Sequence, residues 1–351
     1  MAEQRSVDAM VPGAGADLSP RLRLMLLANG QRMTAMVHVL ATLKIADELA
    51  AGPRPVTELA AATGCHAPAL FRILRCAAMI GVFVEVESEV FGLTPIAEGL
   101  RCDVPDSVRD AVLLDASEMF TKAYSALGHS VRTGGPAFDT VFGKTFWDHL
   151  HDNPEHEAVF DDAITAASRR IGGIYLRRYD FGSPRRIADI GGGHGDFLAA
   201  LLQRLPESTG VLFDRPSVVR RAPALLAERG VTDRVELVGG SFLTDDLPAG
   251  CDLYVLKAVL HDWPDDDAAT ILRRVRAAIG PAPARLMILE QVVAPLNTWD
   301  PAKFLDLDML TVMGGRERNL IEWRRLTADC GFRLTNTPVS GDWAVIECTA
   351  A

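Results

Sequence analysis

Cysteine is scarce in this sequence, and its copies are widely spaced. The 351 residues include six cysteines, none of them in a C-x-x-C pair. The sequence therefore predicts neither a disulfide framework nor a zinc knuckle. Scattered thiols are typical of a reducing compartment, and the first 20 residues lack the apolar core of an export signal. We expect a cytoplasmic protein.

Long hydrophobic runs and an excess of positive charge are also missing. The longest apolar stretch, Cys76 to Val84, is far shorter than the roughly 20 residues that a membrane-spanning helix needs. Lysine and arginine number 36 against 46 aspartates and glutamates, which gives a net charge of −10. A negative field repels phosphate backbones and anionic lipids. We therefore expect neither a membrane nor a nucleic-acid partner.

The length and composition predict a folded protein with more than one domain. A chain of 351 residues, of which 48% are hydrophobic and 23% charged, exceeds the size of one ordinary core. The pattern along the chain divides it into four parts. These are a loose tail over 1–20, a winged-helix domain over 21–105, connecting helices over 106–180 and an α/β domain over 181–351.

The first domain shows helix signals followed by a hairpin signal. Apolar residues at helical spacing predict two helices over 21–50. Thr57 is expected to cap a short helix that ends at Gly64, and Pro68 to open another that runs to Ile80. Alternating apolar residues over 82–93 then predict a two-stranded wing.

A winged helix can bind DNA through the second helix of its turn. Here that helix offers only Arg72 and Arg75, and the wing carries Glu85, Glu87 and Glu89. Because this surface suits a phosphate backbone poorly, a protein–protein module is the favoured interpretation.

From residue 186 onward, short apolar strands alternate with helices. The expected strands are Ile187–Ile190, Gly210–Phe213, Val235–Val238, Leu253–Leu256 and Leu286–Leu289. This order predicts an α/β, Rossmann-like fold with a parallel, doubly wound sheet. A closing hairpin is expected around Ser340, Gly341 and Asp342.

The first of these strands leads into a glycine-rich turn. Asp189 precedes Gly191, Gly193 and Gly195, and such a turn lets a ligand approach the backbone at a helix N-terminus. Asp196 stands where the dinucleotide fingerprint has its third glycine, which disfavours an NAD-dependent oxidoreductase. Asp214 ends the second strand, where an acid can accept both hydroxyls of a ribose.

Four segments together resemble a known family. They are D-I-G-G-G-H-G (189–195), V-L-F-D (211–214), L-K-A-V-L-H-D-W (256–263) and G-G-R-E-R (314–318). Nearly the whole chain is similar to S-adenosylmethionine-dependent small-molecule O-methyltransferases of the caffeic-acid type, including bacterial enzymes that methylate aromatic polyketides and phenazines.

The resemblance implies a class I methyltransferase domain over 181–351 that binds S-adenosylmethionine, and helices over 106–180 that line the substrate pocket. It also implies a homodimer formed through the winged-helix domain. A partner would then cover the apolar helices of residues 21–50, including Leu27, Met36, Leu40 and Leu43.

The same resemblance assigns Asp214 to the ribose, residues 240–242 to the adenine and Lys257 to the neighbourhood of the cofactor. Ser241 stands where many relatives have an aspartate, and its hydroxyl accepts a weaker hydrogen bond than a carboxylate. Together with the glycine turn, the expected cofactor-binding residues are Asp189, Gly191, Gly193, Asp214, Gly240, Ser241, Phe242 and Lys257.

A histidine and two acids are the expected catalytic residues. His261 follows a strand at the edge where α/β sheets bind ligands. A phenol, whose pKa is about 10, needs a general base at neutral pH. Glu290 ends the next expected strand and would orient the imidazole, and Glu317 matches the second acid of the family.

The substrate residues are less distinct in the sequence. The candidates are Trp147, Asp262, Phe304, Asp308, Met309 and Met313. Packing in the core is the alternative for each, and Asp262 could instead cap a local turn. We expect no metal, because a catalytic magnesium needs a cluster of oxygen ligands. His149, His151 and His156 are interpreted as a solvated helix end.

The sequence thus predicts a homodimeric, metal-independent enzyme of secondary metabolism, such as antibiotic biosynthesis. It would transfer a methyl group from S-adenosylmethionine to a hydroxyl of an aromatic or polyketide-like molecule. Methylation at carbon or nitrogen, and a non-methylating relative that keeps the cofactor, remain as alternatives.

Overall fold

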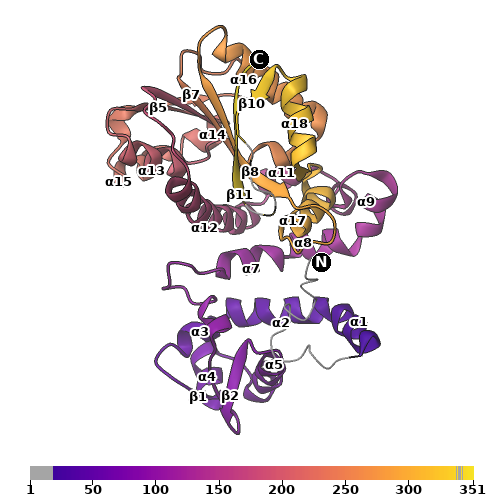
Figure 1. The fold of residues 1–351 in the computed structure, drawn as a ribbon. Coiled ribbons are helices and arrows are strands. Elements are labelled where there is room, and N and C mark those ends of the chain that lie inside the picture. The colour runs from indigo at the N-terminus through magenta and orange to yellow at the C-terminus, as the bar shows by residue number, and fades with distance from the viewer. Residues whose placement is uncertain (1–18, 337, 339–340, 342) are drawn as a thin grey trace, which may run out of the picture. The chain divides into compact units, whose positions relative to one another are not determined.

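The computed structural model describes residues 19–336, 338, 341 and 343–351, which form two compact units (Figure 1). The first unit comprises the chain up to residue 122 together with 150–167, and the second comprises 123–149 and 168–351. Most of the expected tail over 1–20, and Ser340 and Asp342 of the expected closing hairpin, lie outside the described residues.

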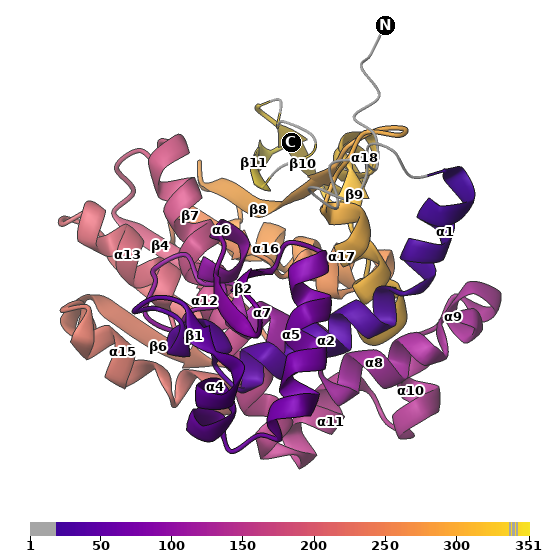
Figure 2. The same ribbon diagram turned by 90° about the horizontal axis from the view of Figure 1, so that it is seen from below.

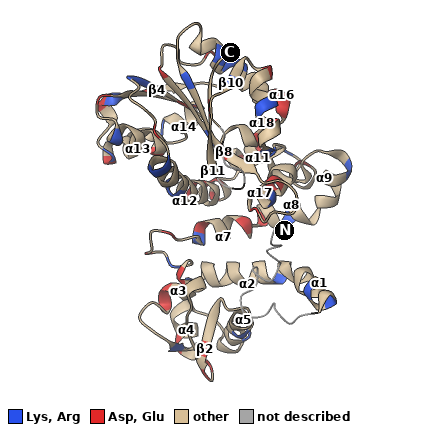
Figure 3. Ribbon diagram, viewed as in Figure 1, with Lys and Arg blue, Asp and Glu red and all other residues tan. Residues whose placement is uncertain are grey.

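The first unit is a set of short helices with a small sheet. Strands β1 (Arg54–Pro55), β2 (Phe83–Glu87) and β3 (Val90–Leu93) form an antiparallel sheet in the order β1-β3-β2. Figure 3 shows the acidic tip of the β2–β3 wing. The helices are α1 (Pro20–Ala28), α2 (Gly30–Thr42), α3 (Ile45–Glu48), α4 (Val56–Thr63), α5 (Ala67–Met79), α6 (Pro95–Glu98) and α7 (Arg109–Asp115).

Glycines end the helices of this unit where the sequence predicted. Gly64 closes α4 in the left-handed region, with φ 68°, and its amide bonds to the carbonyl of Ala60. The expectation that Thr57 caps α4 is wrong: the helix begins at Val56, the extended residue before it is Pro55, and Thr57 lies in the first turn. Proline fits this position because its missing N–H is not needed there.

Some apolar residues of the helices over 21–50 are already buried within the chain itself. Met36 and Leu40 on α2 are 8% and 1% exposed and belong to the core of their own unit, where α2 packs against α5 (Figure 2). Leu43 also packs against this core. The expectation that a partner buries these residues is therefore wrong. On α1, by contrast, Leu24 and Leu27 are 67% and 57% exposed.

The helices between residues 118 and 178 are shared between the two units. They are α8 (Glu118–Ser125), α9 (Leu127–Thr133), α10 (Ala137–Phe142), α11 (Phe146–Asp152) and α12 (Pro154–Arg178). Among the described residues, no helix is both long and apolar enough to cross a membrane.

The second unit is built on one large sheet in the order β10-β11-β8-β7-β4-β5-β6. Its strands are β4 (Arg186–Ile190), β5 (Thr209–Asp214), β6 (Val235–Gly239), β7 (Leu253–Lys257), β8 (Arg285–Val293), β10 (Phe332–Leu334) and β11 (Trp343–Ala350). The five strands predicted from the sequence are parallel, as expected.

One edge of the sheet is antiparallel, and the closing hairpin expected at the end of the chain forms it, with Leu334 opposite Cys348. Strand β11 runs antiparallel to β8, and β10 antiparallel to β11. Only eight residues lie between β10 and β11, fewer than the dozen or so that the crossover of a parallel pair needs. The sheet is therefore mixed. The short strand β9 (Arg318–Asn319) pairs only with the end of β8.

Helices cover both faces of this sheet, with α13 on one side and α16 and α18 on the other (Figure 1). Residues of the central strands are almost all fully buried. The helices are α13 (Asp196–Arg204), α14 (Pro216–Val219), α15 (Ala222–Glu228), α16 (Asp265–Ile279), α17 (Ala302–Asp308) and α18 (Leu320–Asp329), with a π-helical turn η4 (Met309–Met313) after α17.

Candidate active site

The glycine turn between β4 and α13 has little room for side chains. Gly191, Gly193 and Gly195 have φ of 73°, 60° and 85°, a region that glycine tolerates best. A Cβ on Gly192 would lie 2.5 Å from Leu212 Cδ1 and 2.6 Å from Asp189 Cγ. Gly192, which the sequence analysis did not single out, is therefore the most constrained position of the turn.

Asp189 is buried directly beneath this turn. Its side chain is 1% exposed, and neither carboxylate oxygen has a hydrogen-bond partner among the described residues. Burial raises the pKa of Asp189 to about 7. Because a buried carboxylate without partners is costly, this acid is suited to accept a hydrogen bond from a bound ligand.

Lys257, at the end of β7, is the nearby cation. Its Nζ donates to Ser168 Oγ at 2.9 Å and lies 5.9 Å from the centre of the Phe197 ring. Burial lowers the pKa of Lys257, and the charges of Asp189 and Glu290 oppose that effect. The charge of Lys257 therefore interacts with both Asp189, under the glycine turn, and Glu290, on β8.

Asp214 ends β5 and contacts the glycine turn directly. Its Oδ2 accepts the N–H of Gly193 at 2.8 Å, and its Oδ1 accepts the N–H of Arg215 at 2.7 Å. Burial raises the pKa of Asp214. Since each carboxylate oxygen can accept a second hydrogen bond, Asp214 can still bind two ligand hydroxyls.

The segment after β6 brings a further acid to this edge. The amide of Ser241 donates to Asp245 Oδ2 at 2.8 Å, and a Cβ on Gly240 would lie 3.1 Å from the same oxygen. The Phe242 ring contacts the Trp263 ring edge-on, with centroids 5.5 Å apart. Sequence reasoning missed Asp245, because only the turn at 241–245 brings its carboxylate back to Ser241.

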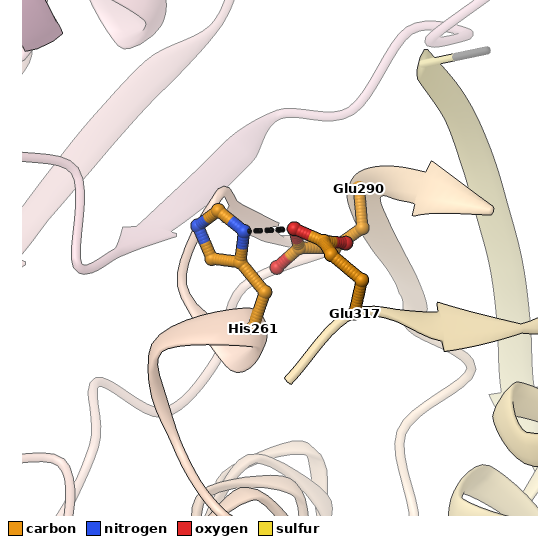
Figure 4. A group of neighbouring side chains, drawn as sticks. All are labelled: His261, Glu290 and Glu317. Carbon is orange, nitrogen blue, oxygen red and sulfur yellow. Dashed lines mark hydrogen bonds and ion pairs between the residues drawn. The ribbon is translucent and has the colours of Figure 1, made fainter. Parts of the chain in front are cut away.

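His261 lies in the short turn η3 (Leu260–Asp262) and is 7% exposed. Its Nδ1 is 2.7 Å from Glu317 Oε1, and Figure 4 shows the two groups facing each other. The other ring nitrogen, Nε2, lies 3.5 Å from Asp262 Oδ1. The structure therefore places Asp262 beside the free end of the imidazole.

Glu290 and Glu317 have different tasks. Glu290 Oε1 accepts the N–H groups of Val259 and Leu260 at 3.0 and 2.9 Å, and its Oε2 is 3.7 Å from His261 Nδ1. The expectation that Glu290 ends its strand is wrong, because β8 continues to Val293, where it pairs with β9. Glu290 lies beside the imidazole, as expected, while Glu317 makes the hydrogen bond to the ring.

The acids around His261 control its protonation. Burial by itself lowers the pKa of His261. The charges of Glu290, Glu317 and Asp262 together outweigh burial and raise the pKa to about 10. Burial raises the pKa of Glu290 to about 7 and that of Asp262 to about 6. In this cluster the imidazole therefore carries its proton at neutral pH.

His261, Glu290 and Glu317 also offer three ligand atoms within 4.8 Å of one another. Two ligands of a tetrahedral metal at about 2.1 Å from the ion would lie about 3.4 Å apart. The 2.7 Å between Nδ1 and Glu317 Oε1 is instead a hydrogen-bond distance. This geometry favours an imidazole–carboxylate pair, and metal independence stays a prediction.

The expected substrate residues differ in their exposure. Met309 is 2% exposed, which fits the packing alternative, whereas Phe304 is 52% exposed and lies against Trp299 at 5.8 Å between centroids. Met313 is half-buried at the end of η4. Asp308 accepts a hydrogen bond from the Tyr124 hydroxyl. The Trp147 ring lies beside the Arg215 guanidinium, 5.6 Å from the ring centre.

The histidine cluster of α11 and α12 differs from the expectation at His149. His149 is 6% exposed and packs edge-on against the stacked pair of Phe138 and Phe142, with centroids 5.3 and 4.7 Å away. The interpretation as a solvated helix end is wrong for His149, because α10 folds its aromatic side chains onto this helix. His151, two residues on, is exposed as expected.

Comparisons with known proteins assign both parts of the chain. Residues 124–333 match the O-methyltransferase domain, and residues 25–100 match the O-methyltransferase dimerisation domain. The chain is 39% identical over 325 residues to phenazine O-methyltransferase PhzM of Lysobacter antibioticus, covering 92% of this chain and 94% of the relative.

Two further relatives extend the range of acceptors. An 8-amino-8-demethylriboflavin N,N-dimethyltransferase of Streptomyces davaonensis is 42% identical over 322 residues, covering 90% of this chain and 92% of the relative. The solved structure of the O-methyltransferase NcsB1 from neocarzinostatin biosynthesis, with S-adenosylmethionine and 2-hydroxy-5-methyl naphthoic acid, matches with TM-score 0.78 and 34% identity over 91% of this chain and 96% of that chain.

The residues present fit S-adenosylmethionine. The glycine turn leaves open space above Gly193, the carboxylate of Asp189 lacks partners among the described residues, and Asp214 keeps lone pairs for hydroxyl groups. These three features lie at the carboxyl edge of adjacent strands, where α/β folds bind nucleotides. The chain belongs to the family of S-adenosylmethionine-dependent O-methyltransferases, with a class I catalytic domain and the dimerisation domain through which it forms a homodimer.

Proposed function

We propose that the chain methylates a hydroxyl group of an aromatic, polyketide-like molecule in the biosynthesis of a natural product, with His261 as the general base. One observation carries this proposal. A buried imidazole, hydrogen-bonded at Nδ1 and surrounded by three acids, lies two residues after Val259, whose side chain adjoins Gly191 of the glycine turn that fits the methyl donor. The relatives that methylate phenazines and bind a naphthoic acid support an aromatic acceptor.

Four groups of this chain would hold the cofactor. Asp189 offers its carboxylate to a donor on the amino-acid part, with Lys257 nearby, and Asp214 offers two acceptors to the ribose. The 240–242 segment would border the adenine, where the Asp245 carboxylate supplies the negative charge that Ser241 lacks. When bound, S-adenosylmethionine supplies a methyl group made electrophilic by the positive sulfur.

His261 manages the proton of the acceptor. Its pKa of about 10 matches the pKa of about 10 of a free phenol, so moving the proton between them costs little free energy. Glu317 bonds the Nδ1–H and stabilises the imidazolium that forms. At neutral pH both His261 and the phenol carry a proton, and the pair must lose one of these two protons before the phenol can react. The rate should therefore rise with pH in the neutral range.

The acid cluster favours oxygen over nitrogen as the acceptor. An aromatic amine already has a free electron pair, whereas a phenol must lose its proton to become a strong nucleophile. A base supported by three carboxylates serves the phenol. The N,N-dimethyltransferase among the relatives makes nitrogen the acceptor to test against this proposal.

We also place the protein in the cytoplasm. The support is the chemistry of its thiols: all six cysteines are free, and three of them are buried. A reducing compartment keeps such thiols unpaired.

The test pairs each phenol with its aniline counterpart. Purified protein is incubated with S-adenosylmethionine and matched phenols and anilines, and S-adenosylhomocysteine and methylated product are measured by mass spectrometry. We expect methylated phenols, and we expect His261→Ala to lose this product. Turnover of the anilines alone, unaffected by His261→Ala, would overturn the proposal.

A further inference from the structure

The turn that carries His261 is weakly held by its own backbone. Its two internal hydrogen bonds, from Asp262 N to Val259 O and from Trp263 N to Leu260 O, are 3.2 and 3.4 Å long. A short 3₁₀ turn of this kind has poor hydrogen-bond geometry. The position of the imidazole therefore depends on bonds from elsewhere in the chain.

Two buried charged side chains supply those bonds. Glu290 accepts the amides on the N-terminal side of the turn. Arg318 donates from Nη1 to Leu260 O at 2.9 Å and from Nη2 to Trp263 O at 3.0 Å. The guanidinium thus bonds the carbonyls that precede and follow the pair His261-Asp262.

The environment of Arg318 fixes its own position. Its side chain is 1% exposed and lies 5.3 Å from the centre of the Trp323 ring. Nε donates to Asp265 Oδ1 at 2.9 Å. A buried guanidinium is tolerated only when its donors are bonded, and the rigid fork of arginine can bond two carbonyls and a carboxylate at once.

Residues next to Arg318 in the sequence contact the same turn. A Cβ on Gly315 would lie 2.0 Å from His261 O, and Arg316 N donates to that oxygen at 2.8 Å. Glu317, which the sequence analysis did assign, bonds the ring at Nδ1. The segment 315–318, here called the clasp, therefore binds both the backbone and the ring of His261.

We propose that Arg318 is a positioning residue for methyl transfer. It holds the His261 turn against the clasp, so that Nδ1 stays hydrogen-bonded to Glu317 and Nε2 faces Asp262. This inference rests on the proposed function, in which His261 is the base. Lysine at this position could reach one carbonyl but could not bridge Leu260 and Trp263.

The test compares Arg318→Lys with Arg285→Lys. Arg285 is an arginine of the same domain that is partly buried, with an ion pair to Glu347 and a bond to Phe181 O, but it lies at the opposite end of β8. For each variant we would measure thermal unfolding, the calorimetric Kd of S-adenosylhomocysteine, and kcat. The pKa of His261 would be measured by NMR on histidine-labelled protein, with His261→Gln assigning its signal among the 8 histidines.

For Arg318→Lys we expect kcat to fall about 10²-fold, the loss that misplacing a reacting group by about 1 Å can cause. The Kd for S-adenosylhomocysteine stays unchanged. The pKa of His261 falls, because its contact with Glu317 loosens. Arg285→Lys lowers the unfolding temperature but leaves kcat and the pKa of His261 as in the parent.

An Arg318→Lys protein that is less stable but keeps the parental kcat and His261 pKa would show a purely structural arginine and overturn the inference. If that variant does not fold, Asp265→Asn decides by the same readouts, because it releases Arg318 through an exposed side chain. If His261→Ala keeps its activity, the proposed function fails, while the pKa of His261 in Arg318→Lys still tests the clasp.

Discussion

Replacing Glu290 by glutamine tests the electrostatics of the base. Glutamine keeps an oxygen that can accept the Val259 and Leu260 amides but removes the charge that lies 3.7 Å from His261 Nδ1. Two unit charges at that separation interact by about 4 kcal/mol at an effective dielectric constant of about 20. One pKa unit is about 1.4 kcal/mol, so the pKa of His261 should fall by about three units.

The expected result is a change in the shape of the pH profile. In the parent, the pKa of His261 is about 10, so kcat/KM for a phenol should rise until about pH 10. In Glu290→Gln the rise should end near pH 7, followed by a plateau. The variant is therefore least impaired at neutral pH, and its loss grows with pH.

The assay is kcat/KM across pH 6 to 11 with one identified phenol, in parent and variant. The Kd for S-adenosylhomocysteine serves as the control for a folded cofactor site. A Glu290→Gln profile that rises to the same pH as the parent would refute the assignment of the raised His261 pKa to its buried acids.

Three further outcomes follow from the structure. Asp214→Ala should weaken S-adenosylhomocysteine binding in calorimetry, because each lost bond to a charged group contributes about 1.5 to 3 kcal/mol, and an unchanged Kd would remove Asp214 from the site. Leu24→Asp with Leu27→Asp should yield monomers in light scattering, since both side chains are exposed on the unit that matches the dimerisation domain, and an intact dimer would contradict this. Protonated His261 is stabilised by the fold, because its pKa is about 10 in the folded protein and about 6.5 in the unfolded chain. This stabilisation is fully present below about pH 6.5 and is lost as pH rises towards about 10. His261→Gln should lack that loss in denaturant titrations, and equal pH dependence in both proteins would count against it.

The sequence predicted those parts of the fold that depend on local patterns. The five parallel strands and the glycine stop at Gly64 follow from periodicity and backbone freedom within a few residues. The closing hairpin of β10 and β11 was also predicted, but the antiparallel pairing of β11 with β8 was not, because it depends on a partner far away in the sequence. The burial of Met36 depends on packing against α5, which the pattern of α2 alone does not show.

The sequence predicted which residues form the candidate site, but not which contact each of them makes. His261, Glu290 and Glu317 were assigned from motifs and strand ends, yet the ring is bonded by the acid 56 positions away and not by the acid on the next strand. Arg318 belongs to the G-G-R-E-R segment, but its role was not predicted, because its partners lie in a turn more than 50 residues earlier. Roles of this kind arise from tertiary contacts, which spacing in the sequence does not encode.

The most direct test of the account compares the parent with His261→Ala at pH 7, using S-adenosylmethionine, an identified phenol and added EDTA. The account predicts that the variant binds S-adenosylhomocysteine like the parent and methylates about 10² to 10⁴-fold more slowly, the usual contribution of a positioned base. It also predicts that EDTA changes neither rate. Equal turnover by both proteins would show that holding the phenol near the methyl donor is enough, and would contradict the role of His261 as the base.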